Sequence, residues 1–496
     1  MQIPIQVSEH SGVGLQEQIF EQIQTLILDG RLPAGSPLPA SRALARDLGV
    51  SRNTVLGAYQ RLAEQGLVRT REQAGTYVAP HEHAVGPRKE LRTPHAPPGP
   101  KGTPDAALQR RLQFRARPHR VVSPHPVRLR YDFWIGQVDP RLYPTRVWRG
   151  LVSRMLAAPA AQLCSYGDPQ GLPQLREAIA AYVGAARGIA TDASRVLITN
   201  GIQEGLSLLA RLLVRPGDDV ALEDPCYRGA SSVFASHGAG LHAVAVDRDG
   251  IDTSALPESA ALAYVTPSHQ YPMGATLSLE RRAALLLWSR DCGAYVVEDD
   301  YDSDFYYDEA PLPALKSDDR FDQVIYLGTF SKCLGAGLRI GYMILPRRLV
   351  GPARAAKALL SNCQPWLEQA ALGAFIAEGD HARHLRQLRR ICAARRDHLR
   401  AAIEHQLPGS RIEGAHSGMH LAARLPPELP GSQRIERAAR LAGVGVYGVE
   451  SANAQLFDAQ RAGELDRYLL FGYAALDETG ISEALLSLRR AIDSLR

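Results

Sequence analysis

The sequence lacks the features of a membrane or secreted protein. No apolar run approaches the roughly 18 residues that a membrane-spanning helix needs. The polar start, MQIPIQVSEH, also lacks the basic and then apolar layout of a secretion signal. The six cysteines are scattered without close pairs, which argues against a disulfide framework and against a cysteine-based zinc site. We therefore expect a cytoplasmic protein without a membrane partner and without a bound metal.

A strong overall charge is also missing, since the formal net charge is only +5 over 496 residues. The basic residues are nevertheless concentrated between residues 81 and 130, in a stretch rich in Pro, Gly, His and Arg. Such a composition with little periodicity is typical of a linker. Because 496 residues exceed one compact core, we predict a first domain over 1–80, a basic linker over 81–128 with one short helix near 106–117, and a second domain over 129–496.

The first 80 residues show the pattern of three short helices followed by a hairpin. Apolar residues recur at the spacing of one helix face between residues 15 and 28. We expect Ser41 to cap a second helix over 42–48 and Ser51 to cap a third that runs to about residue 65. Strand-like pieces near 67–69 and 76–78 complete the hairpin.

Residues 38–62, LPASRALARDLGVSRNTVLGAYQRL, resemble the winged helix-turn-helix of the GntR superfamily, and the resemblance extends to AGTYV at 74–78. The start of the third helix can present side chains to base edges and free amides to phosphate. The resemblance implies that double-stranded promoter DNA is a partner. The expected DNA-binding residues are Arg42, Ser51, Arg52, Asn53, Thr54, Gly75 and Thr76, with Arg52 as the main base reader.

The second domain alternates apolar strand-like runs with longer helical patterns, which predicts a mostly parallel sheet covered by helices on both faces. From about residue 375 onward, long Arg/Ala/Leu helices and a few strands predict a smaller α+β lobe. The strand-like runs are 196–199, 220–222, 262–265, 295–298, 324–327 and 340–344.

Two motifs in this domain carry the chemistry. VEDDYDSDF at 297–305 is a strand that ends in acids, and YLGTFSKCLGAGLRIGY at 326–342 contains a strand that ends in Ser-Lys. This is the layout that a Schiff base with an aldehyde cofactor needs. Lys332 supplies the amine, and a carboxylate can keep a pyridine nitrogen protonated so that the ring withdraws electrons.

The motifs resemble those of fold-type I aminotransferases, and their combination with a GntR-type head resembles the MocR/GabR regulators. The resemblance implies pyridoxal 5'-phosphate as cofactor, held by a large α/β lobe and a small α+β lobe. It makes Lys332 the Schiff-base lysine, Asp299 the partner of the pyridine nitrogen, and Tyr301 a hydrogen-bond partner of the phenolic oxygen. Thr329, Ser331 and Arg339 are then expected to hold the phosphate.

Four further segments carry the same resemblance. TNGIQEG at 199–205 is similar to the phosphate-cradling turn at a helix start, with Ile202 and Gln203 as contacts. EDPCYR at 223–228 nominates Tyr227 to stack on the ring, and TPSHQYPMG at 266–274 nominates His269 beside the phenolic oxygen. YGDPQGL at 166–172 resembles the loop that inserts a tyrosine, here Tyr166, into the partner subunit's phosphate site, which implies a homodimer.

One departure from the aminotransferase pattern bears on function. Aligning LLFGYA at 469–474 puts Leu470 where aminotransferases place the arginine that clamps the substrate α-carboxylate. Arg467 is close in sequence but need not point into the pocket. Losing such a charged partner weakens carboxylate binding by roughly 2–5 kcal/mol.

The sequence therefore favours a regulator that senses a small amine, an amino acid or pyridoxal phosphate itself through Lys332, with at most a transaminase half-reaction. The missing clamp favours pyridoxal phosphate as the effector. Two alternatives stay open: a working aminotransferase that carries a DNA-binding module, and a DNA-binding protein whose second domain is only structural. The basic linker is either a solvated tether or an additional contact to DNA phosphate.

Overall fold

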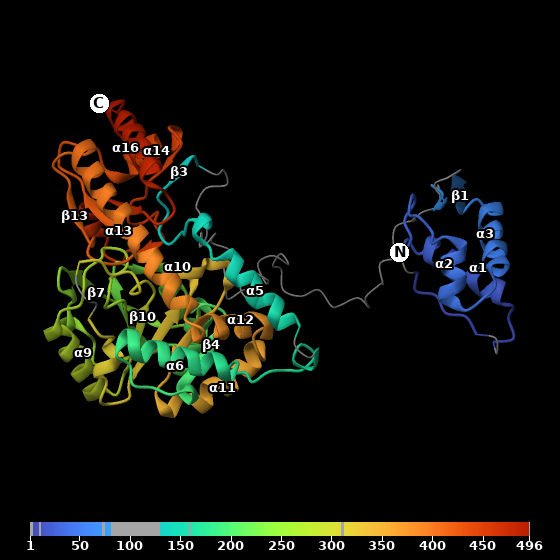
Figure 1. The fold of residues 1–496 in the computed structure, drawn as a ribbon, viewed down its shortest axis with the longest axis horizontal. Coiled ribbons are helices and arrows are strands. Elements are labelled where there is room, and N and C mark those ends of the chain that lie inside the picture. Colours follow the sequence, from blue (N-terminus) through green and yellow to red (C-terminus); the bar gives the residue numbers. More distant parts are fainter. Residues whose placement is uncertain are drawn as a thin grey trace, which may run out of the picture. The chain divides into compact units, whose positions relative to one another are not determined.

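The computed structural model describes residues 3–8, 11–71, 75–80, 129–157, 160–308 and 312–495. They belong to two compact units, one within residues 1–112 and one within 113–496 (Figure 1). The predicted linker over 81–128, with its helix near 106–117, lies outside the described residues. In the described parts of the chain no helix is both long and apolar enough to cross a bilayer.

The N-terminal unit has the three helices and the hairpin that its sequence predicts. Apolar residues from all three helices meet in one core, among them Ile19, Ile23, Leu44, Val55 and Leu62. The strands pair antiparallel, with Arg69 opposite Tyr77. The elements are α1 (Leu15–Leu28), α2 (Ser41–Leu48), α3 (Arg52–Glu64), β1 (Val68–Arg71) and β2 (Gly75–Val78).

The helix caps agree with the sequence at Ser51 but not at Ser41. Ser51 caps α3, because its hydroxyl accepts a hydrogen bond from the Thr54 amide at 3.1 Å. Ser41 is the first residue of α2, and Ala40 occupies the cap position without a side-chain bond. The Ser41 hydroxyl instead accepts from Arg52 Nε at 3.4 Å, which joins the starts of α2 and α3.

The larger unit is built on an eight-stranded sheet with the strand order β4-β12-β11-β10-β9-β5-β7-β8. Strands β11, β10, β9, β5 and β7 run parallel, and β12 is antiparallel to both of its neighbours. All six predicted strand-like runs fall in this sheet. The strands are β4 (Val196–Thr199), β5 (Asp219–Asp224), β7 (Gly240–Asp247), β8 (Gly250–Ile251), β9 (Ala260–Val265), β10 (Tyr295–Asp300), β11 (Val324–Thr329) and β12 (Gly341–Ile344).

Helices cover both faces of this sheet, as expected (Figure 1). Val297 and Ile325 pack on one face with Leu206 and Leu209. Their neighbours in sequence point to the opposite face, where Val296 packs with Leu285. The helices of this lobe are α6 (Pro173–Arg187), α7 (Ile202–Leu213), α8 (Arg228–Ser236), α9 (Leu279–Cys292), α10 (Ser331–Leu334), α11 (Arg347–Ser361) and α12 (Trp366–Ala377).

The smaller lobe has long helices around a three-stranded antiparallel sheet, β13-β14-β17, which confirms the predicted α+β lobe. Two short strand pairs also form, β15 with β3 and β16 with β6. The second pair carries the C-terminal segment onto the large lobe beside Tyr227. The remaining elements are β3 (Tyr131–Asp132), α5 (Thr145–Leu156), β6 (Cys226–Tyr227), α13 (Asp380–Gln406), β13 (Arg411–Glu413), β14 (His420–Arg424), α14 (Ser432–Leu441), β15 (Val444–Gly445), β16 (Ala454–Gln455), α15 (Ala462–Leu465), β17 (Tyr468–Gly472) and α16 (Glu478–Asp493).

Candidate functional site

The carboxyl ends of the parallel strands meet around a cavity of about 240 Å³, which we call the cofactor cavity. In sheets of this kind, ligands bind beyond the carboxyl ends of the strands. Thr266 directly follows β9, Tyr301 directly follows β10, and Thr329 is the last residue of β11. The lining residues are Trp134, Ile135, Ile202, Gln203, Tyr227, Tyr264, Thr266, Tyr271, Asp299, Tyr301, Thr329, Ser331, Lys332, Ala336, Arg339 and Asn453.

Lys332 lies on α10, directly after β11, and lines this cavity. The backbone of Gly136 approaches it so closely that a side chain there would overlap the Lys332 amine, and Gly136 has a φ of 83°. Burial lowers the pKa of Lys332 below its ordinary value, partly opposed by the charges of Asp302 and Asp299. A larger share of the amine is therefore neutral at physiological pH, which is the form that attacks an aldehyde.

Asp299 is 4% exposed, and its two carboxyl oxygens differ. Oδ2 accepts a hydrogen bond from the Tyr264 hydroxyl at 2.6 Å. Oδ1 is buried and has no hydrogen-bond partner among the described residues. Burial raises the pKa of Asp299 to about 7, against the opposing effect of the Tyr264 bond. The cavity thus holds a carboxyl oxygen that needs a donor, which a protonated pyridine nitrogen would supply.

Aromatic side chains form much of the remaining wall. Tyr227 and Tyr271 meet edge to face with ring centroids 6.0 Å apart. The Tyr227 hydroxyl donates to Gln203 Oε1 at 3.3 Å, and Tyr301 lies beyond, with the Lys332 amine 5.8 Å from its ring centroid. Such a set of rings suits a flat aromatic ligand.

One end of the cavity presents groups suited to an anion. Gly201 precedes α7 with a φ of 77°, so the helix begins with free amides beside the cavity. Arg339, whose backbone is left-handed with a φ of 55°, donates to the Asn200 carbonyl at 2.9 Å. On the facing turn, the Thr329 hydroxyl donates to the Ser331 hydroxyl at 3.0 Å.

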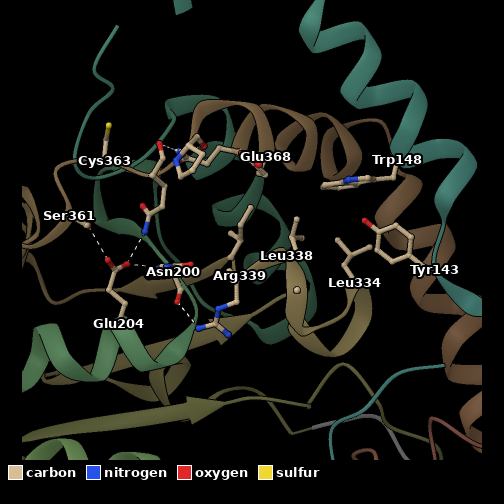
Figure 2. A pocket seen from close by; sticks show the side chains of 15 residues that line it. Tyr143, Trp148, Asn200, Glu204, Leu334, Leu338, Arg339, Ser361, Cys363 and Glu368 are labelled. Atoms are coloured by element: carbon tan, nitrogen blue, oxygen red, sulfur yellow. Dashed lines mark hydrogen bonds between the residues drawn. The ribbon is translucent and has the colours of Figure 1, made fainter. Parts of the chain in front are cut away.

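A second, larger cavity of about 570 Å³ shares Arg339 with the first, and we call it the outer cavity. Figure 2 shows Arg339 bonded to Asn200 and Glu204 bonded to Ser361 along its wall. Glu204 also accepts from the Asn200 amide at 2.5 Å and from the fully buried Lys357 at 3.3 Å. These hydrogen bonds connect the turn at Asn200 and Gly201, which precedes α7, to α11.

Leu470, which the sequence pattern aligns with the carboxylate clamp of an aminotransferase, lies in apolar surroundings. Leu470 is 0% exposed and belongs to a cluster with Trp134 and Tyr447. Arg467 points elsewhere, since its guanidinium donates to the carbonyls of Leu429, at 2.8 Å, and of Pro426. Neither residue supplies a cation to the cofactor cavity.

In the N-terminal unit, the predicted DNA-binding residues gather at the starts of α2 and α3 and on β2. Arg42, Ser51, Arg52 and Asn53 are exposed, and Thr54 is half-buried. In the hairpin, Gly75 is exposed with a φ of 99° and Thr76 follows it, whereas residues 72–74 lie outside the described parts.

Comparison with known proteins bears on both units. The family model for bacterial regulatory proteins of the gntR family matches residues 15–78, and that for aminotransferase class I and II matches residues 144–458. The chain is 34% identical to the probable rhizopine catabolism regulatory protein MocR of Rhizobium meliloti, over 97% of this chain and 94% of that protein. The chain belongs to the MocR-type GntR regulators.

Another relative of this MocR-type chain is the pyridoxine biosynthesis regulator PdxR of Corynebacterium glutamicum, 28% identical over 99% of this chain and 98% of that protein. Among solved structures, α-aminoadipate aminotransferase LysN of Thermus thermophilus, in complex with N-(5'-phosphopyridoxyl)-L-leucine, matches with a TM-score of 0.65 and 29% identity over 73% of this chain and 92% of that chain. Kynurenine aminotransferase of Pyrococcus horikoshii matches with a TM-score of 0.66 and 25% identity over 75% and 92%.

These findings establish the fold and the cofactor of the MocR-type chain. It joins a GntR-type DNA-binding head to a fold-type I aminotransferase domain, and the cofactor of that domain is pyridoxal phosphate. The residues of the cavity fit this group: Lys332 offers the amine, Asp299 the free carboxyl oxygen, and the Gly201 turn and Arg339 the anion site.

Nine of the predicted cofactor residues line the cofactor cavity, and two do not. His269 lies behind Tyr301, its Nδ1 3.2 Å from that hydroxyl, while Tyr271, two residues later, reaches the cavity. Tyr166 is 88% exposed and lines a different cavity, beside Cys363. The nine are Ile202, Gln203, Tyr227, Asp299, Tyr301, Thr329, Ser331, Lys332 and Arg339.

The sequence did not single out several other lining residues. Tyr264, next to the last residue of β9, lies one strand away from Asp299, and the predicted strand-like runs do not say which strands are neighbours. Trp134 and Asn453 come from segments far from the motifs in sequence. The positive φ of Asn453, 66°, marks a constrained position, but it is visible only in the structure.

We predict that pyridoxal phosphate stabilises the protein more at pH 8 than at pH 6. The pKa of Asp299 in the empty cavity is about 7, so the carboxyl is ionised above that pH and costs stability there. Pairing with a protonated pyridine nitrogen relieves this cost. The contribution of Asp299 to stabilisation by the cofactor therefore grows as pH rises through 7 and is lost as pH falls below 7. Thermal unfolding with and without cofactor at both pH values measures the difference.

The control for this prediction is Asp299→Asn, which should remove most of the pH dependence. Glu223 and Glu298 also have pKa values raised to about 7 by burial, but neither lines the cavity, so their contributions cancel between the two cofactor states. An equal cofactor effect at both pH values in the unchanged protein would contradict the role given to Asp299.

Proposed function

We propose that this regulator senses a small molecule in the cofactor cavity, that pyridoxal phosphate itself is the favoured effector, and that Lys332 holds it covalently. One observation carries the proposal: Leu470, which the sequence pattern aligns with the carboxylate clamp of an aminotransferase, is fully buried among apolar side chains. The name of the relative PdxR, a regulator of pyridoxine biosynthesis, supports the same effector.

The charges of the cavity support this choice of effector. Among the described lining residues, Lys332 and Arg339 are the cationic side chains. The first is the amine for the aldehyde, and the second lies at the phosphate end. An amino acid would therefore bury its α-carboxylate without a cation, at a cost of about 2–5 kcal/mol. Pyridoxal phosphate, or an amine without a carboxylate, avoids this cost.

The proposed working form is a homodimer. Tyr166 is exposed on a loop near Cys363, and the outer cavity beside Arg339 is open and partly apolar, with Trp148 in its wall. A second copy that inserts its own Tyr166 loop here would add a hydroxyl to the phosphate end of the neighbouring cavity. Two heads in one dimer would then suit an operator with two half-sites.

Signalling would depend on the two lobes. Residues of the large lobe, such as Lys332 and Asp299, and residues of the C-terminal segment, such as Asn453, line the same cavity. A ligand that binds one arrangement of the lobes better than another shifts the equilibrium between the two arrangements. The size of the shift is set by the ligand's difference in affinity for them. The heads are proposed to read promoter DNA in the cytoplasm, with the shift passed to them through the linker.

The test is a titration of the purified protein with pyridoxal phosphate and with candidate amines and amino acids. Visible absorbance of the bound cofactor and binding to the DNA upstream of the protein's own gene are followed in parallel. We expect pyridoxal phosphate to change both signals, and Lys332→Ala to abolish the absorbance and the DNA response while leaving basal DNA binding. Steady turnover of an amino acid would support the aminotransferase alternative, which the intact Lys332 and Asp299 arrangement favours.

Restoring the clamp should restore recognition of amino acids. In Leu470→Arg the new guanidinium can pair with an α-carboxylate, so we expect affinity for an amino acid effector or substrate to rise at least about 30-fold, the low end of what a buried charged partner is worth. Leu470→Met keeps the size without the charge and should change nothing. Equal affinities in the two variants, both folded, would exclude a carboxylate site at this position.

Arg52 and Arg42 should differ in what they contribute to DNA binding. Arg52→Ala removes the expected base contact, so we predict a loss of about 1–3 kcal/mol on the operator and little loss on bulk DNA. Arg42→Ala should weaken both alike if it contacts phosphate. Competition binding at two salt concentrations separates these outcomes. A uniform loss for Arg52→Ala would assign it to phosphate.

A further inference from the structure

A buried cluster of histidines and an acid lies behind the cofactor cavity, between the two lobes. His269 and Asp302 belong to the large lobe, and His420 begins β14 of the small lobe; all three are 3% exposed or less. None of them lines the cavity, yet the Tyr301 hydroxyl lies 3.2 Å from His269 Nδ1. The cluster therefore touches a wall residue of the cofactor cavity from behind.

The hydrogen bonds of His269 define its protonation state. Nδ1 is 3.0 Å from Asp302 Oδ2, and Nε2 is 3.1 Å from the carbonyl oxygen of Gly414. A carboxylate and a carbonyl only accept hydrogen bonds, so each ring nitrogen must carry a hydrogen to make both bonds. Turning the ring over would face both acceptors with carbon. Nδ1 also lies 3.2 Å from the Tyr301 hydroxyl, which can accept from it as well. The doubly protonated, positively charged ring is the form that satisfies both acceptors.

We infer that His269 is a permanent imidazolium, a positioning residue that fastens loop 414–420 of the small lobe to the large lobe at the Tyr301 side of the cofactor cavity. This loop connects β13 and β14. The inference does not depend on which effector the protein senses, because it concerns the protein before any ligand is bound.

The pKa values of the groups around His269 are consistent with a single positively charged histidine, paired with the ionised Asp302. Burial disfavours a charged His269, but the charge and hydrogen bond of Asp302 raise the pKa of His269 above its ordinary value. Burial also disfavours an ionised Asp302, but the charge and hydrogen bond of His269 lower the pKa of Asp302. His420, with ring centroid 4.7 Å away, has its pKa lowered to about 3 by burial and by His269. His416, at 6.1 Å, also has a lowered pKa, mainly through burial. Lys332 acts on the cluster from the cavity side, favouring the ionised Asp302.

The loop is built to sit close to this charge. Asp302 Oδ2 accepts a hydrogen bond from the Met419 amide at 3.3 Å. The ion pair therefore bonds the loop at two residues, Gly414 through His269 and Met419 through Asp302. Gly418, with a φ of 79°, lies against the His269 ring, where any side chain would overlap it. Gly414 meets Gly274 of the large lobe in the same way. These contacts attach the loop to the His269–Asp302 pair, in addition to the hydrogen bonds that join Gly418 to Phe305, Tyr307 and Tyr473.

The protonation state can be measured directly in the full-length protein without added cofactor. In protein labelled with ¹⁵N-histidine, we expect one ring whose two nitrogens both stay protonated at pH 8, where an ordinary histidine is neutral. That signal should be absent in His269→Gln and present in His416→Gln. A spectrum of the unchanged protein in which every histidine is neutral at pH 8 would overturn the inference.

A second measurement tests the fastening of the loop. Glutamine is uncharged and can donate to only one of the two acceptors, so His269→Gln should speed amide hydrogen exchange in 414–420 by about tenfold, the effect of losing one charged hydrogen bond. His416→Gln, on the same loop but bonded to Thr276 rather than to the His269–Asp302 pair, should leave it unchanged. Equal exchange in both variants would show that His269 does not hold the loop.

The charge on His269 should also change the pH at which the bound cofactor is protonated. Removing a cation from behind Tyr301 makes protonation of the nearby chromophore easier, so the pH midpoint of the visible absorbance should move upward in His269→Gln and stay in place in His416→Gln. A role for His269 in packing alone would loosen the loop without moving this midpoint. An unmoved midpoint would therefore limit His269 to packing and overturn the inference of a charge.

Discussion

The fold around the cofactor cavity depends most on the buried carboxyl group of Asp299. A buried carboxyl group needs partners for both oxygens, and here Tyr264 satisfies one while the other remains open. The sheet holds Asp299 in place, because it lies in β10 and pairs in register with Leu327 of the parallel strand β11. The open oxygen is a cost to the empty protein and a source of affinity for a ligand that donates to it. Cofactor binding and stability of the domain are therefore linked through one atom.

The cofactor cavity is lined by both the large lobe and the C-terminal segment, which lie far apart in sequence. The strand ends supply rigid groups, Lys332 among them, whereas Asn453 arrives through the short pairing of β16 with β6. A ligand in contact with both resists any change in their separation. A domain with this design can serve catalysis or sensing, and its fold alone does not distinguish them. The tethered GntR-type head and the apolar Leu470 are the features that favour sensing.

Much of the fold and of the cavity could be predicted from the sequence, since local patterns encode them. Strand ends, the Ser51 cap and the Ser-Lys turn are local features, and all appear where expected. What failed depends on contacts distant in sequence. Ser41 was expected to cap α2, but its hydroxyl bonds Arg52 of the next helix. Tyr271 rather than His269 reaches the cavity because the loop after β9 turns His269 back against Asp302.

The proposed replacement of the clamp by Leu470 has a consequence for selectivity. A cavity that retains an arginine binds any α-amino acid through its carboxylate, so abundant amino acids would compete with the intended ligand. An apolar residue at that position penalises all of them by the desolvation of the same group, about 2–5 kcal/mol, or roughly 30-fold or more in affinity. The discrimination comes from leaving a buried charge unpaired. Selectivity for a ligand without that carboxylate then needs no additional contact.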